Sequence, residues 1–163
     1  MAAVAGGDDA ALAELLGRWQ RPLFHFIDRQ TGGRDVEDLH QETWLRAVRA
    51  ADRFNPRRRF STWLFQIALN LCRDWRRRAP PVSIGTVADD VPAPGDERTE
   101  ARLDARRLLA ALPDAQREVV ILRYCHDLSE DDVAVILGCP PGTVKSRLHH
   151  AMATLKSLAG VES

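Results

Sequence analysis

A run of hydrogen-bonding side chains near the C-terminus is suited to reading duplex DNA. It falls in the first half of a helix that we expect over residues 143–158, where a recognition helix meets base edges and phosphates in the major groove. Lys145 and Arg147 cannot both point at the groove floor, so we expect one to contact bases and the other phosphate. Exposed histidines often contact nothing specific, which is the alternative for His149 and His150. The candidate duplex contacts are Thr143, Lys145, Ser146, Arg147, His149 and His150.

A second segment combines arginines with aromatic side chains. Residues 53–78 hold eight arginines and a single acid, Asp74. Arginines follow a phosphate backbone and aromatic rings stack on unpaired bases, which favours single-stranded or opened DNA. Residues 55–59 form a loop that is free to close over an extruded base. Burial in the core is an equal alternative for Phe60 and Trp63, and the preferred one for Trp75. The candidate contacts are Asn55, Arg57, Arg58, Arg59, Phe60, Trp63, Gln66, Asn70, Arg73 and Arg77.

Three helices are expected to position the first half of the chain. The first covers residues 10–31 and ends at Gly32-Gly33, and the second begins near Asp35, whose carboxylate can cap it. The third starts near Ser61, a natural N-cap, and runs to Arg78. Helical spacing places apolar side chains on one stripe of the second and third helices. These stripes are Val36, Leu39, Thr43, Ala47 and Ala51, then Phe60, Trp63, Leu64, Ile67, Ala68, Leu71 and Trp75.

Four more helices are expected in the second half, over residues 98–112, 114–126, 129–137 and 143–158. Ser129 followed by Asp132 resembles a capping box, Gly138 permits a left-handed stop, and Thr143 can cap the next helix. Residues 129–158 therefore predict a helix-turn-helix. A plain helical hairpin with a solvated basic face is the alternative. The apolar face of the first of these two helices is Val133, Ala134, Ile136 and Leu137, and the second buries Val144, Leu148, Ala151, Leu155 and Leu158.

The two halves are separated by a segment without helical periodicity. Residues 79–97 hold four of the nine prolines and several acids, which is typical of a flexible linker. No strand is indicated. We therefore expect an all-α protein of two small helical domains, residues 1–78 and 98–163, joined by the linker 79–97.

Composition excludes several classes of protein. The three cysteines form no CxxC pair, so we expect buried, reduced thiols and neither a disulfide framework nor a metal site. Acids stand where a signal peptide needs positive charge, and no apolar run is long enough to span a membrane, so we expect a cytoplasmic protein without membrane insertion. No glycine-rich phosphate loop or nucleophile motif appears, which indicates neither an enzyme nor a cofactor.

Three stretches together resemble the extracytoplasmic-function (ECF) sigma factors of bacteria, the small promoter-specificity subunits of RNA polymerase within the sigma-70 family. DVEDLHQETWLRAVRAADRF (35–54) is similar to the family's region 2.2, and FSTWLFQIALNLCRDWRRR (60–78) to regions 2.3 and 2.4. ALPDAQREVVILRYCHDLSEDDVAVILGCPPGTVKSRLHHAMATLK (111–156) is similar to region 4. Their order across a linker makes the resemblance highly specific.

The resemblance implies a division of labour. The helix over residues 35–54 would dock on core RNA polymerase, the arginine-rich helix and its preceding loop would bind and melt the −10 element, and residues 143–149 would read the −35 element. An anti-sigma factor is an implied partner. His150 and Met152 stand where family members commonly have arginine, which weakens the expected phosphate contact. From charge alone, a solvated face is the preferred interpretation of the acids. The candidate polymerase contacts are Asp38, Gln41, Glu42 and Leu45.

Linker length allows both an extended and a compact chain. Elements about 17 base pairs apart are separated by roughly 58 Å of duplex, and about 20 residues extend to some 66 Å. A relaxed linker of this length spans only about 25 Å. A compact free or inhibited state is therefore a hypothesis.

Two other functions remain open at this point. The first is a helix-turn-helix transcription regulator whose N-terminal half serves dimerisation or sensing. It explains residues 129–158 but not the separation of acids and arginines in the first half. The second is a metal or redox sensor that uses Cys125, His126 and Cys139.

Overall fold

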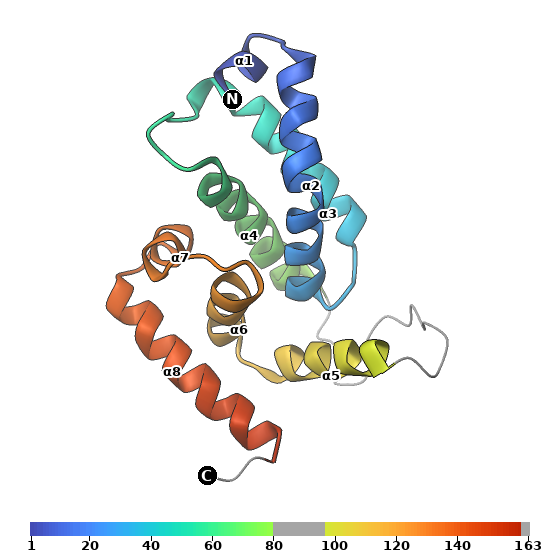
Figure 1. The fold of residues 1–163 in the computed structure, drawn as a ribbon, viewed down its shortest axis with the longest axis vertical. Helices are drawn as coiled ribbons and strands as arrows, with labels where there is room; N and C mark the ends of the chain where they lie inside the picture. Colours follow the sequence, from blue (N-terminus) through green and yellow to red (C-terminus); the bar gives the residue numbers. More distant parts are fainter. Residues whose placement is uncertain (80–96, 161–163) are drawn as a thin grey trace.

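The computed structural model describes residues 1–79 and 97–160, and these residues form helices without any strand, as the sequence predicts (Figure 1). The expected linker lies outside the described residues except at its two ends. The first half contains α1 Ala2–Ala5, α2 Asp9–Thr31, α3 Val36–Arg49, the short 3-10 helix η1 Ala51–Arg53 and α4 Phe60–Arg78. The second half contains α5 Glu97–Ala111, α6 Asp114–Val120, the π-helical turn η2 Ile121–Cys125, α7 Glu130–Leu137 and α8 Pro141–Leu158.

The first half is a bundle in which α2, α3 and α4 pack against one another. The apolar stripe expected on the second helix is confirmed, because Val36, Leu39, Thr43, Ala47 and Ala51 are all buried. This burial fixes the opposite face of α3, with its acids, toward solvent.

Two expected helix caps in this half are wrong. Asp35 adopts a left-handed backbone conformation with φ 51°, and its carboxylate accepts a 2.8 Å hydrogen bond from the indole of Trp75 instead of capping α3. Ser61 lies inside α4, which begins one residue earlier at Phe60 without a side-chain cap. In the first case tertiary contact with α4 outweighs the local capping preference of an aspartate.

The helix-turn-helix forms from α7 and α8. Ser129 caps α7 as expected, because its hydroxyl accepts a 3.1 Å hydrogen bond from the Asp132 backbone N–H, and Gly138 ends the helix at φ 67°. Thr143 does not cap α8, which begins at Pro141, a residue preorganised for the first helical position. Leu158 is 48% exposed, so the expected inner stripe of α8 ends before it. The expected helix over residues 114–126 is divided, because it changes to a π-helical turn at Ile121.

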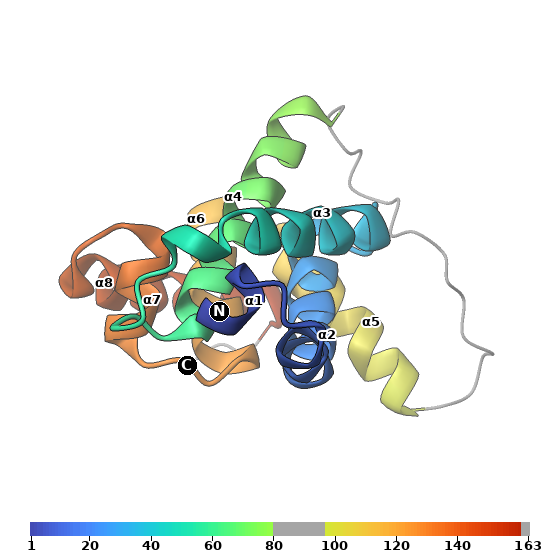
Figure 2. The same cartoon turned by 90° about the horizontal axis from the view of Figure 1, so that it is seen from above.

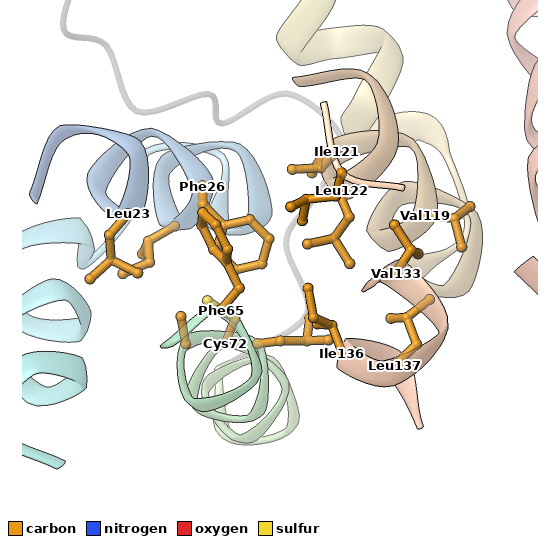
Figure 3. Packing of buried hydrophobic residues seen from close by; sticks show 14 of the residues in the cluster. Leu23, Phe26, Phe65, Cys72, Val119, Ile121, Leu122, Val133, Ile136 and Leu137 are labelled. Carbon is orange, nitrogen blue, oxygen red and sulfur yellow. The ribbon is translucent and has the colours of Figure 1, made fainter. Parts of the chain in front are cut away.

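The two halves share one core. Buried apolar residues of α2, α3 and α4 form a continuous cluster with those of α6, η2, α7 and α8. Figure 3 shows Phe26 and Phe65 in the gap between the helices of the first half and Ile121 and Leu122 of the second. Seen from above, α4 stands between α7 and α8 on one side and α2 and α3 on the other (Figure 2).

Burial of α4 is therefore wider than its expected stripe. Leu64, Ala68 and Leu71 are buried as predicted, whereas Thr62, Phe65, Leu69 and Cys72 are buried in addition. Phe65 contacts the ring of His126, which belongs to the second half. A single helix thus serves as a packing surface for both halves of the chain.

The ring of His126 fills the apolar boundary between the halves. Its centroid lies 5.6 Å from that of Phe26 and 5.0 Å from that of Phe65. Its Nε2 atom is buried and has no hydrogen-bond partner within residues 1–79 and 97–160. Burial, with the positive charges of Arg29 and His25 on α2, lowers the pKa of His126 to about 4.

This histidine predicts that the folded chain loses stability in mild acid. Unfolding returns the pKa of His126 to its ordinary value near 6.5, so the unfolded chain takes up a proton below that pH whereas the folded chain resists it until about pH 4. The free energy of unfolding is therefore highest above pH 6.5. It falls progressively as the pH is lowered toward 4, by about 3 kcal/mol in all. Denaturant unfolding at pH 7.5, 6.5, 5.5 and 5.0 measures it.

His126→Phe is expected to flatten this dependence between pH 6.5 and 5, because it keeps an aromatic ring at the boundary and removes the titrating nitrogen. His149→Gln is the matched control, since His149 is an exposed histidine on α8 that does not lie at the boundary between the halves. A dependence that is equally steep in the His126→Phe variant would show that other groups cause it.

Candidate nucleic-acid interface

The outer face of α8 presents the residues predicted for duplex contact. Lys145, Ser146, His149 and His150 are exposed, and Thr143 and Arg147 are half-buried. Val144, Leu148 and Ala151 fix this orientation, because they are buried against the rest of the helix-turn-helix. All six candidates therefore lie on one helix, at or beside its solvent face.

Only some of these side chains are free to bind. The Ser146 hydroxyl donates a 3.0 Å hydrogen bond to the carbonyl of Thr143, and Lys145 lies 3.8 Å from a carboxylate oxygen of Glu130. The Lys145 side chain is 71% exposed, so this ion pair is weak and easily exchanged for a phosphate.

The loop before α4 exposes three arginines in a row. Asn55 organises it, because its side-chain oxygen accepts a 3.0 Å hydrogen bond from the backbone N–H of Arg57. Arg57 and Arg58 reach solvent, whereas Arg59 forms a 2.7 Å ion pair with Asp132 of α7. The loop thus combines two cations that form no ion pair within residues 1–79 and 97–160 with one that is bound by the second half.

The aromatic candidates at the start of α4 lie in a cluster of rings. Phe60 contacts Trp19, Trp44, Phe54 and Trp63 at centroid distances of 6.0 to 6.4 Å. Both Phe60 and Trp63 are only half-buried. Each ring therefore packs against the core and keeps part of its surface accessible.

Trp75, for which burial is the preferred expectation, is also only half-buried. Its indole bonds to Asp35, and the guanidinium of Arg34 lies 4.8 Å from its ring centroid. It packs against the core from the surface between α3 and α4 without being enclosed there.

The polar face of α4 is partly occupied. Asn70 and Arg77 are exposed and Gln66 is half-buried, but Arg73 binds both carboxylate oxygens of Glu118, at 3.0 and 2.7 Å. This hydrogen-bonded carboxylate raises the pKa of Arg73. Arg73 is therefore held as a cation against α6 and does not face solvent freely.

Three residues that hold the α4 arginines or pair beside them were not predicted from the sequence, namely Arg76, Glu118 and Asp132. Glu118 is buried and binds Arg76 at 2.5 Å as well as Arg73, and Asp132 binds Arg59. A signal for Glu118 exists, since an acid directly before the apolar run 119–122 must find a cationic partner when that run is buried. No comparable signal marks Asp132. An aspartate at this position is already accounted for by the capping box, so its pairing with Arg59 could not be anticipated.

Arginines from both halves meet around one pocket. It has a volume of about 380 Å³ and lies between α4, α6 and α8. Its lining residues are Arg73, Arg76, Arg77, Asp114, Ala115, Glu118 and Arg147. The structure thus brings Arg73 and Arg77, predicted for opened DNA, next to Arg147, predicted for duplex DNA.

The predicted polymerase contacts lie together on α3. Asp38, Gln41 and Leu45 are exposed, and Glu42 is half-buried with a 2.7 Å ion pair to Arg46. Leu45 is 43% exposed and lies on the same helix as Val48, which is 39% exposed, so two aliphatic side chains stand among polar neighbours.

A pocket of about 550 Å³ adjoins this face. Leu39, Leu71 and Trp75 provide its apolar lining, and Asp38 and Glu42 belong to it. Such a mixture of apolar and charged lining suits a protein side chain or a peptide segment.

The cysteines depart from the expectation of uniform burial. Cys72 is buried, which raises the pKa of its thiol to about 12, but Cys125 is exposed and Cys139 is half-buried. In residues 1–79 and 97–160, no three His, Cys, Asp or Glu side chains come together as metal ligands. Among the helices of the same ranges, none is both long enough and apolar enough to cross a membrane.

Comparisons with known proteins match both halves. Residues 15–80 match sigma-70 region 2, and residues 102–155 match sigma-70 region 4. The ECF RNA polymerase sigma factor SigW of Bacillus subtilis is 33% identical, with 94% of this chain and 91% of that protein covered. The ECF RNA polymerase sigma-E factor of Escherichia coli K12 is 31% identical, with 91% and 86% covered.

Solved structures agree. CnrH, in complex with the cytosolic domain of CnrY, is 31% identical and superposes with a TM-score of 0.77 over 99% of this chain and 96% of its own. The sigma factor RpoE of Bartonella quintana, in complex with the anti-sigma factor NepR, is 26% identical, with a TM-score of 0.76 over 94% and 99%. With regions 2 and 4 in order and relatives matched along nearly their whole length, the chain belongs to the ECF sigma factors of the sigma-70 family, the non-enzymatic subunits that direct promoter-specific transcription initiation.

Proposed function

We propose that three helices divide the work of promoter-directed initiation. In this proposal α3 docks on core RNA polymerase, α4 with its preceding loop binds the −10 element, and α8 reads the −35 element. Residues 1–78 and 98–163 act as the two DNA-binding units, and the linker 79–97 joins them. The observation that carries the proposal is the match to regions 2 and 4, in this order, at residues 15–80 and 102–155.

Polymerase docking on α3 is supported by the character of its outer face. Asp38 and Gln41 are exposed on the same helix as Leu45, an aliphatic residue that is 43% exposed. Apolar residues that are surrounded by polar ones form the energetic centre of many protein interfaces. The neighbouring 550 Å³ pocket gives a partner side chain a place to insert.

Binding of opened DNA is supported by the start of α4. Arg57 and Arg58 offer exposed guanidinium groups to phosphates, and half-buried Phe60 and Trp63 offer ring surface to an unstacked base. Their packing in the aromatic cluster holds these rings in place before DNA arrives, which reduces the entropy cost of binding.

Duplex reading is supported by α8, which presents its polar residues on the face opposite its buried stripe. The chain is also proposed to be held inactive by an anti-sigma factor, as RpoE of Bartonella quintana is found with NepR. We place the protein in the cytoplasm, where its polymerase and promoter targets are.

Transcription in vitro tests the function as a whole. The purified chain, added to core RNA polymerase and a genomic promoter library, is expected to direct initiation from a limited set of start sites that share −10 and −35 sequences. Core polymerase alone is the control. A chain that binds duplex DNA but never redirects core polymerase would instead be a helix-turn-helix regulator.

Replacing Arg147 tests the reading helix. Arg147→Ala is expected to lower affinity for a −35 duplex by about 1–3 kcal/mol, because a guanidinium contact to base or phosphate is lost. Lys156→Ala is the matched control, since Lys156 is exposed in the last turn of the same helix, away from the predicted contacts. Fluorescence anisotropy at several salt concentrations measures both, and equal losses in the two variants would indicate non-specific charge attraction only.

Replacing Leu45 tests the docking helix. Leu45→Asn is expected to weaken competition for core polymerase about tenfold, since loss of a central apolar contact costs more than about 1 kcal/mol. Val135→Asn is the control, because Val135 is 44% exposed on α7 and outside the proposed contact. Competition against a labelled sigma factor gives the affinities. Undiminished competition by the Leu45→Asn variant would place the docking surface elsewhere.

A further inference from the structure

The carboxylate of Glu118 is buried between two arginines of the other half. The residue is 3% exposed, and its oxygens accept hydrogen bonds from Arg73 at 3.0 and 2.7 Å and from Arg76 at 2.5 Å. Arg76 is held in turn by Gln30 at 3.0 Å. A carboxylate at this depth needs such partners, because an unpaired buried charge is strongly unfavourable.

A second carboxylate of the same half binds at the opposite end of α4. Asp132 accepts a 2.7 Å hydrogen bond from Arg59 and lies 3.5 Å from the hydroxyl of Thr62. Arg59 and Arg73 are both in the set proposed to contact DNA. The second half thus forms ion pairs near both ends of α4. Between these two ion pairs, Phe65 of α4 packs against the ring of His126 and belongs to the shared apolar core (Figure 3).

These contacts have the chemistry of an arginine on a DNA backbone. A guanidinium donates its paired N–H groups to a carboxylate in the same forked geometry that it uses for a phosphate. Glu118 makes this forked contact with Arg73. While the carboxylate is there, a phosphate cannot take its place.

The distance between the promoter elements is a separate reason why this arrangement of the two halves is incompatible with binding both elements. Arg73 and Arg77 of α4 line one pocket of about 380 Å³ together with Arg147 of α8. The −10 and −35 elements lie roughly 58 Å apart along duplex, for a spacing of about 17 base pairs. Side chains that share one pocket cannot reach both elements.

We propose that Glu118 and Asp132 form an intramolecular lock, in which they take the places of DNA phosphates on Arg73 and Arg59. The inference rests on the proposed function of α4. In the locked chain Arg59 and Arg73 cannot contact the −10 element, and full promoter binding requires the halves to separate. The lock lowers the apparent affinity for promoter DNA by the fraction of molecules that are open.

A reversible cross-link tests the lock. In a Cys125→Ser, Cys139→Ser background, Thr62→Cys and Asp132→Cys are joined by a bifunctional thiol reagent that contains a reducible disulfide. The cross-linked protein is expected to bind a −10/−35 promoter fragment with core polymerase at least about tenfold more weakly than the reduced protein. Reductant is expected to restore binding. The single variant Thr62→Cys, treated identically, controls for modification alone.

Each result has a definite meaning. Failure of the cross-link to form would show that the two residues are not neighbours in solution, and full promoter binding by the cross-linked protein would show that closure does not inhibit. Either result overturns the lock. A reduced protein that fails to initiate with core polymerase would contradict the proposed function instead, so the two failures are distinguishable.

Neutralising Glu118 tests the charge itself. Glu118→Gln keeps the shape of the side chain and removes its charge, so we expect a larger radius of gyration by small-angle scattering and about tenfold tighter binding of a −10 oligonucleotide without polymerase. Asp104→Asn is the control, since Asp104 is exposed on α5 and its ion pair among the described residues, with Arg107, lies within its own helix. Circular dichroism verifies that both variants remain helical. An unchanged radius and affinity for the Glu118→Gln variant would overturn the proposal.

Discussion

The buried carboxylate of Glu118 determines how the two halves of this protein meet. It lies on α6, beside an apolar run that must be covered, and its charge must be compensated in the same place. Arg73 and Arg76 of α4 provide that compensation one helical turn apart. The charge is therefore paired with α4, whereas the apolar run packs against α8, α2 and α7, so that α6 and η2 are held from two sides.

The consequence is that the DNA contacts proposed for α4 compete with its contacts inside the molecule. Its apolar stripe completes the bundle with α2 and α3, and its remaining surface is divided between the second half of the chain and solvent. An arginine-rich helix that binds DNA also attracts carboxylates, because both anions accept the same forked hydrogen bonds. The proposed competition between Glu118 and a phosphate rests on this shared chemistry.

Local patterns predicted the helix-turn-helix and the face of α3 correctly. Ser129 and Gly138 delimit α7 through contacts with their nearest neighbours, and the apolar stripe from Val36 to Ala51 follows from helical spacing alone. The caps expected from Asp35 and Thr143 failed for different reasons. Asp35 is turned toward Trp75, 40 residues away, and Pro141 starts α8 before Thr143 is reached.

The sequence by itself determined most of the helices, the apolar stripe of α3 and, through three motifs, membership in the ECF sigma factors, because each of these depends on residues close together in the chain. Only the tertiary structure decided which arginines are free. Arg57 and Arg58 reach solvent, whereas Arg59 and Arg73 are bound to Asp132 and Glu118. Those pairs join residues 45 to 73 positions apart, and no periodicity along the chain records such a separation.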